Sequence, residues 1–122
     1  MQIAIDIDGT ITRYPLIFNE LICLFRAGAH CVVILTGAAV PNPASVDRAA
    51  LHTGRLLQLS PLLQEPIPPI EICVGRDPTE VADLKARFCL DHSIDLLIDD
   101  SKIYCDWVRS ISPRTAVLMV YP

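Results

Sequence analysis

The sequence predicts an α/β protein with a five-stranded, mostly parallel sheet and helices on both faces. Five short apolar runs, rich in β-branched residues, alternate with segments that carry helix signals. Strands that alternate with helices are joined by right-handed crossovers, which make the strands parallel. Most of the runs contain no alternating polar residue, as expected for strands buried on both faces.

Glycine, proline and short polar side chains delimit the expected elements. The expected strands are residues 2–6, 31–35, 70–74, 94–98 and 116–120. The expected helices run from Pro15 to the residue before Gly28, from a cap at Ser45 to Leu59, onward from Pro78, and from a cap at Ser101 to about Arg109.

Two of these helices carry further expectations. The helix after Pro15 is largely apolar and is expected to be well buried. The helix at Pro78 has the clearest start, because Asp77 and Glu80 form an Asp version of the capping box. Between the second helix and the third strand, three prolines in residues 66–69 predict an extended loop.

Length and composition limit what the chain can be. Its 122 residues fit one domain, residues 1–122, and 52% hydrophobic content is enough for a compact core. A net charge of -4 argues against a broad basic surface for binding nucleic acid or anionic lipid. No leader and no membrane-length apolar segment is visible, so we expect a soluble cytoplasmic protein.

The cysteines predict reduced, mostly buried thiols. Five is an odd number, and no two of them form a C-x-x-C pair, so neither a complete disulfide set nor a zinc site is indicated. The five are Cys23, Cys31, Cys73, Cys89 and Cys105.

Polar residues follow the expected strands at their carboxyl ends. Asp6 and Asp8 follow the first strand, Thr36 the second, and Asp99 and Asp100 the fourth. In open parallel sheets ligands bind at this edge, near the point where strand order reverses. Each residue alone has an ordinary explanation, since an Asp before Gly is usually a turn residue. Their joint occurrence indicates a site.

The carboxylates of this site would need a cation. Asp6 and Asp8 lie about 6 to 7 Å apart along a strand, where their repulsion at a dielectric of ~20 is roughly 2.5 kcal/mol. Asp99 and Asp100 would increase it. A carboxylate-rich site with no His or Cys suits Mg²⁺, so we expect Mg²⁺ as the cofactor.

Lys85 interrupts an apolar helix face. It lies within roughly 40° of the centre of the stripe formed by Val81, Leu84 and Phe88. Its stem can cover apolar surface while the amine reaches water. Beside an anionic cluster, the ammonium would instead hold both carboxylate and phosphate.

In this order the polar residues resemble the four motifs of the haloacid dehalogenase (HAD) superfamily of phosphohydrolases. The motifs are Asp6-Ile-Asp-Gly-Thr-Ile-Thr12, Thr36-Gly37, Lys85 and Asp99-Asp100. They span most of the chain, and the first is quite specific. The resemblance implies a three-layer Rossmann-like fold. Larger members insert a cap soon after the first motif or between the third strand and the helix that carries Lys85. Here neither gap holds more than a short loop or a single helix, so we expect one catalytic domain without a separate cap domain.

The resemblance also implies a role for each motif residue. Asp6 would attack phosphorus to form an aspartyl-phosphate, and Asp8 would protonate the leaving oxygen and then activate water. Thr36 and the Gly37 amide would bind phosphate oxygens, with Lys85 stabilising their charge.

The metal site is implied in the same way. The first motif supplies the carboxylate of Asp6 and the backbone carbonyl of Asp8, and the last motif supplies an acid. On that pattern Asp100 is the direct ligand and Asp99 supports it.

Asp8 narrows the reaction. Dehalogenases of the family lack an acid here because halide leaves without a proton, whereas the alkoxide of a phosphate ester needs one. The prediction is a Mg²⁺-dependent phosphatase acting on a phosphomonoester of unknown class. Phosphoryl transfer to another acceptor would use the same residues and stays an alternative.

Without a cap the site is expected to be open. Open sites in this family often act on larger substrates or borrow a wall from a partner subunit, which would make the chain a homo-oligomer. Residues 38–69 carry Arg48, His52 and Arg55, which either line the entrance or are solvated helix residues.

Two other classes of function stay open. Receiver domains of signalling proteins also combine a parallel sheet, a phosphorylated Asp, Mg²⁺, Thr and Lys. Their paired acids follow the first strand, however, while here the pair Asp99-Asp100 follows the fourth. A HAD member that binds phosphate without turnover is the third alternative.

Overall fold

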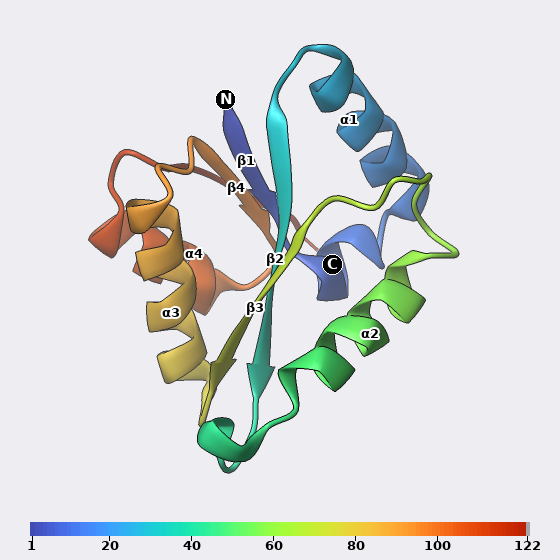
Figure 1. Cartoon of the computed structure of the whole chain (residues 1–122). Helices are drawn as coiled ribbons and strands as arrows, with labels where there is room; N and C mark the ends of the chain where they lie inside the picture. Colours follow the sequence, from blue (N-terminus) through green and yellow to red (C-terminus); the bar gives the residue numbers. More distant parts are fainter. Residues whose placement is uncertain (122) are drawn as a thin grey trace.

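The computed structural model describes residues 1–121 and contains a five-stranded sheet (Figure 1). The strand order is β3-β2-β1-β4-β5, and every neighbouring pair is parallel. The strands are β1 (Gln2–Ile5), β2 (Cys31–Ala39), β3 (Ile70–Gly75), β4 (Leu96–Asp99) and β5 (Ala116–Met119). The α/β prediction is confirmed, and β2 continues four residues beyond its expected end at Leu35.

Helices cover both faces of the sheet. In Figure 1, α1 and α2 lie on one side and α3 and α4 on the other, which gives three layers. The helices are α1 (Pro15–Ala27), α2 (Arg48–Leu59), α3 (Pro78–Asp91) and α4 (Lys102–Ile111). Two short turns, η1 (Ile7–Ile11) and η2 (Pro43–Ser45), precede α1 and α2.

Alternating residues of the central strands supply two separate cores. Ile3 and Ile5 of β1 pack on the α1 side with Phe18, whereas Ala4 packs on the α3 side with Val81. Successive strand residues point to opposite faces, so a strand covered on both faces needs apolar residues at every position. This is why the predicted strands read as unbroken apolar runs.

Two helix expectations are corrected. Helix α1 buries only one face, because Phe18 and Ile22 are buried while Leu16 is 83% exposed. Helix α2 is capped by Asp47, whose carboxylate accepts a hydrogen bond from the Ala50 amide at 3.0 Å. Ser45 lies in the preceding η2 turn, where its hydroxyl donates to a backbone carbonyl instead.

The starts of α3 and α4 are confirmed. The Asp77 carboxylate accepts from the Glu80 amide at 2.8 Å, and the Ser101 hydroxyl accepts from the Tyr104 amide at 3.3 Å. The second arm of the capping box is missing, because the Glu80 carboxylate pairs with Arg76 at 3.0 Å.

The chain reverses its direction of sheet growth beside β1. It passes from β1 to β2 and β3 on one side, then returns to place β4 and β5 on the other. The crevice at such a switch point is where open parallel sheets bind ligands. Asp6 follows β1 and Asp99 ends β4, so both lie at this crevice.

Two of the connections between elements are short. Only η1 and the single helix α1 lie between β1 and β2, and only residues 76–77 lie between β3 and α3. Within residues 1–121, no helix combines the length and the apolar character needed to cross a membrane.

Candidate functional site

Three carboxylates converge at the ends of β1 and β4. The Asp6 amide donates to the Ile98 carbonyl at 3.0 Å, which continues the pairing of β1 and β4 beyond the strand. Carboxylate oxygens of Asp6, Asp99 and Asp100 lie within 4.8 Å of one another. Asp6 and Asp99 are buried and Asp100 is half-buried, so the group opens to solvent on the Asp100 side.

Lys85 reaches this group from α3. Its ammonium Nζ donates to Asp6 Oδ1 at 3.0 Å and to Asp99 Oδ2 at 2.8 Å, and the side chain is 0% exposed. It also lies 4.4 Å from the centre of the Tyr104 ring, at cation–π distance. A lysine amine that reaches water is therefore ruled out here. The apolar stripe that carries Lys85 buries its charge against the carboxylates.

Burial controls the protonation of Asp6. The pKa of Asp6 is raised to about 7, because desolvation and the repulsion of Asp99 together outweigh the attraction of Lys85. Burial alone would lower the pKa of Lys85, but the two carboxylates together raise it above its ordinary value. Lys85 thus stays charged, and near neutral pH Asp6 readily holds a proton that a bound cation would displace.

Gly9 allows the turn after β1 to approach Asp100. Its φ is +76°, and a Cβ on it would lie 2.0 Å from Asp100 Oδ2. The neighbouring Thr10 hydroxyl makes a long contact of 3.5 Å with Asp100 Oδ1. Only glycine fits between this turn and the Asp100 carboxylate.

The paired acids Asp99 and Asp100 differ in how they are held. Asp99 accepts from Lys85 and from the Ser101 amide, the latter at 3.0 Å, and is fully buried. Among residues 1–121, the hydrogen-bond contact of Asp100 is the long one with Thr10, and Asp100 is half-buried. Asp100 is thus the more exposed of the two, and its role as the direct metal ligand stays a prediction.

Asp8 lies apart from the other three acids. Its side chain is 62% exposed, and Oδ1 accepts from Gln58 Nε2 at 2.7 Å while Oδ2 lies 3.5 Å from Arg55 Nη1. The structure therefore brings together three of the four predicted carboxylates. Metal binding through the Asp8 backbone carbonyl stays a prediction.

Thr36 and Gly37 lie inside β2 and not in a loop that follows it. Thr36 is buried, and Gly37 packs so tightly against α3 that a Cβ would lie 2.4 Å from Val81 Cγ1. The same Cβ would lie 3.6 Å from the Tyr104 hydroxyl. Gly37 also accepts from Arg55 Nη2 at 2.9 Å through its carbonyl, so β2, α2, α3 and α4 all meet near this residue.

Helix α2 contributes residues that the sequence left open or did not indicate. Of the three basic residues considered for the entrance, Arg55 contacts Asp8, Arg48 lies 3.4 Å from the Ile72 carbonyl, and His52 is exposed. Gln58 was not predicted, although its spacing of three from Arg55 places both on one helix face. Tyr104 also went unpredicted, although it lies in the first turn of the helix that follows Asp99-Asp100.

The donor set fits a hard divalent cation. Three carboxylates supply oxygen ligands only, one of them is half-buried, and the single buried ammonium does not balance their charge. Mg²⁺ prefers such ligands and commonly keeps part of its water shell. Asp6 and Asp100 would be the residues to hold such an ion, and both the ion and its identity stay predictions.

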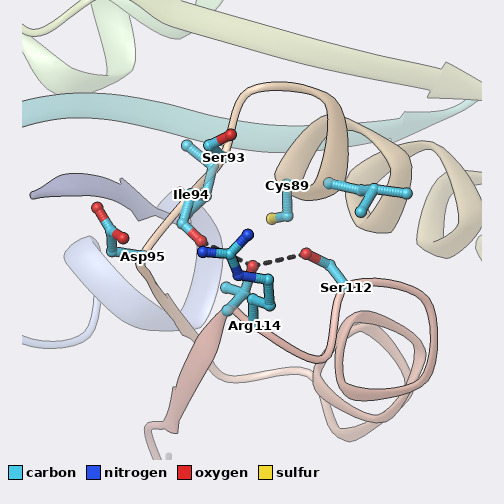
Figure 2. A pocket seen from close by; sticks show the side chains of 8 residues that line it. Cys89, Ser93, Ile94, Asp95, Ser112 and Arg114 are labelled. Carbon is cyan, nitrogen blue, oxygen red and sulfur yellow. Dashed lines mark hydrogen bonds between the residues drawn. The ribbon is translucent and has the colours of Figure 1, made fainter.

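The hollow shown in Figure 2 lies elsewhere. It measures about 170 Å³, and Asp95 on its wall precedes β4, so it is at the opposite edge of the sheet from Asp99. Ser112 and Thr115 share a 2.7 Å hydrogen bond there, and the Thr115 hydroxyl lies 2.7 Å from the Ile94 carbonyl. These polar groups already satisfy one another.

All five cysteines are free, and three of them, Cys73, Cys89 and Cys105, are buried. Burial raises the pKa of the Cys73 thiol to about 11, which keeps it protonated and unreactive.

No protein-family model matches the chain, and no curated protein matches it either.

Proposed function

We propose that this chain is a Mg²⁺-dependent phosphatase that hydrolyses a phosphomonoester through an aspartyl-phosphate on Asp6. One observation carries the proposal: the carboxylates of Asp6, Asp99 and Asp100 lie within 4.8 Å of one another beside a buried lysine. The resemblance of the four motifs to the HAD superfamily supports the choice of reaction.

Asp6 is the proposed nucleophile. Lys85 holds its Oδ1, which leaves Oδ2 for the attack. A bond forms between this oxygen and phosphorus as the bond from phosphorus to the ester oxygen breaks. Burial fixes the direction of the carboxylate and removes the water that would otherwise shield it.

Asp8 is the proposed acid and base. It gives a proton to the departing ester oxygen, and its carboxylate then takes a proton from the water that attacks the aspartyl-phosphate. Inorganic phosphate leaves and Asp6 is regenerated. Because Asp8 is 62% exposed, its carboxyl group is open to both a leaving group and water.

The phosphate-binding roles of Thr36, Gly37 and Lys85 remain part of the proposal. Lys85 would stabilise the charge on the transferring phosphoryl group from within the carboxylate cluster. Asp6, Asp100 and the Asp8 carbonyl would hold Mg²⁺, which supplies positive charge for the phosphate oxygens when it is bound. The five free thiols support a reducing, cytoplasmic compartment.

A phosphate-release screen with Asp6→Asn tests the proposal. Wild type, incubated with Mg²⁺ and a panel of phosphomonoesters, is expected to release phosphate, and Asp6→Asn to lose more than about a thousandfold in rate. Asp91→Asn, an exposed acid at the end of α3, is the matched control and should retain wild-type activity. Equal release by wild type and Asp6→Asn would show that Asp6 is not the nucleophile.

A second candidate is phosphate binding or signalling without turnover. The contacts of Asp8 favour it, because Gln58 and Arg55 already engage the carboxylate that would have to act as acid and base. Trapping of beryllium fluoride on Asp6, with no turnover of any ester, would support this function. Transfer of phosphate to an added alcohol in place of release would identify a phosphotransferase.

A further inference from the structure

Helix α2 reaches the site through a small polar network. Arg55 bridges the turn after β1 and strand β2, since Nη1 lies 3.5 Å from Asp8 Oδ2 and Nη2 donates to the Gly37 carbonyl at 2.9 Å. Gln58 completes it, with Nε2 donating to Asp8 Oδ1 at 2.7 Å and Oε1 accepting from Arg55 at 3.3 Å. One helix face thus brings a cation and an amide to the proposed acid and base.

The ion pair of Arg55 with Asp8 is loose. Charge-assisted N–H···O bonds are usually about 2.7–2.9 Å long, and this one is 3.5 Å. Asp8 is also 62% exposed, so water competes for its carboxylate. An incoming anion can therefore replace Asp8 at Nη1 with little loss.

Arg55 has the geometry to receive that anion. Its guanidinium carries five N–H donors in a planar fork that matches a carboxylate or a phosphate. The Gly37 carbonyl and the helix hold it in place, and 21% of the side chain is exposed. Asp8 would meet the ester oxygen, so Arg55 lies on the side of the leaving group.

We propose that Arg55 is a specificity-determining residue that binds a second anionic group on the leaving part of the substrate. The substrate class is then small phosphomonoesters that carry a carboxylate or a second phosphate close to the ester oxygen. Gln58 keeps Asp8 in position when Arg55 turns to the substrate. This inference rests on the proposed function.

Pairs of esters that differ only in the second anion test the inference. One pair is 3-phosphoglycerate and glycerol 3-phosphate, and the other is propane-1,3-diol bisphosphate and 3-hydroxypropyl phosphate. In at least one pair, wild type is expected to favour the ester with the second anionic group by about tenfold or more in kcat/KM. The pair that is discriminated tells whether Arg55 takes a carboxylate or a phosphate.

Arg55→Gln is expected to reduce that preference to near one, and Arg55→Lys to keep part of it. Arg48→Gln, on the same helix but in contact with the Ile72 carbonyl, should keep the full preference. If Arg55 only positioned Asp8, Arg55→Gln would lower kcat for both members alike and leave the preference intact. That result, or a wild type without any preference, would overturn the inference.

A binding measurement separates this inference from the proposed function. Asp6→Asn is titrated calorimetrically with the same four esters, with and without the Arg55→Gln change. Suppose that no ester is hydrolysed, but that the esters with a second anionic group bind about tenfold more tightly than their partners and lose this advantage in Arg55→Gln. The phosphatase proposal then fails and the anion site stands. Equal binding of both members of each pair would remove the anion site whatever the outcome for hydrolysis.

Discussion

Helices α3 and α2 each bring one cation to the carboxyl edge of the sheet, but they hold it in opposite ways. Helix α3 buries five residues, among them Lys85 at 0% exposure, whereas α2 buries only Leu59. Lys85 contacts two buried carboxylates at 2.8 and 3.0 Å, and Arg55 contacts one exposed carboxylate at 3.5 Å.

The fold requires the cation of Lys85, whereas it only tolerates that of Arg55. A buried charge that loses its partner is costly, because water cannot replace the partner. An exposed ion pair contributes little, because water and salt compete for it. Lys85 therefore belongs to the structure as much as to the site, while Arg55 is free to change partners.

Removing Lys85 tests the first half of this comparison and has the largest expected effect. Lys85→Met leaves Asp6 and Asp99 buried without their cation, so the free energy of unfolding should fall by about 3–5 kcal/mol. Urea unfolding at pH 7 measures it. Arg55→Met is the matched variant on α2 and should change stability by about 1 kcal/mol or less.

Similar losses for the two variants would contradict the comparison. If Lys85→Met cost no more than Arg55→Met, the carboxylates around Lys85 would have to be stabilised by other means. Added Mg²⁺ restoring Lys85→Met stability would instead indicate that a cation can take over the neutralising role of the ammonium.

The same comparison explains what could be predicted from the sequence. Lys85 was predictable because it interrupts an apolar stripe, and a buried lysine needs an anion, which Asp6 and Asp99 supplied. The apolar residues on the same face of α3, such as Val81, indicate that this face is buried.

The sequence left the role of Arg55 open and did not indicate Gln58, because α2 has no such stripe in contact with the core. The exposed Leu57, at 71%, shows that apolar spacing on α2 does not report which face meets the protein. The contacts of both residues with Asp8 arise from tertiary packing across 47 and 50 residues of chain.

The predictions for the cap of α2 and for the position of Gly37 were wrong for different reasons. Ser45 and Asp47 are both good caps, and the choice between them depends on the η2 turn, which proline at position 43 favours. Thr36-Gly37 resembles a turn after a strand, but its pairing with β3 carries the strand on to Ala39. A strand ends where its pairing with the neighbouring strand ends, and the local sequence does not indicate that point.

The pH dependence of stability tests whether burial raises the pKa of Asp6. The folded pKa of Asp6 is raised to about 7 from an ordinary value of 3.8, so the folded state binds its proton more tightly than the unfolded state. In metal-free protein this contribution to stability is fully present below pH 4 and is lost as pH rises toward 7. Its slope can reach about 1.4 kcal/mol per pH unit.

Urea unfolding in EDTA at several pH values between 4 and 8 measures this slope. Asp6→Asn cannot titrate, so its stability should fall less steeply with pH than that of wild type over the same window. Parallel curves for the two proteins would contradict a raised pKa of Asp6. Arg55→Gln, remote from this proton, should follow the wild-type curve.

A methyl group at Gly37 probes the packing of α3 against the sheet. In Gly37→Ala the new Cβ would lie 2.4 Å from Val81 Cγ1, and Val81 is fully buried. Overpacking of this kind costs about 1–3 kcal/mol, because α3 or Val81 must move. Thermal or urea unfolding measures the loss, and Gly37→Ala, Val81→Ala should recover part of it by giving the methyl group room.

The smallest expected effect has the opposite sign and belongs to α2. Gly54 lies inside that helix, and a Cβ on it would meet nothing within 4 Å. Gly54→Ala should therefore raise the free energy of unfolding by about 0.5–1 kcal/mol, because alanine favours the helix and restricts the unfolded chain. Hydrogen exchange should slow at the amides of α2 and stay unchanged in α3. A destabilised Gly54→Ala would mean that α2 packs against a surface more closely than its exposure indicates, and the contrast between a tightly held α3 and a loosely held α2 would have to be abandoned.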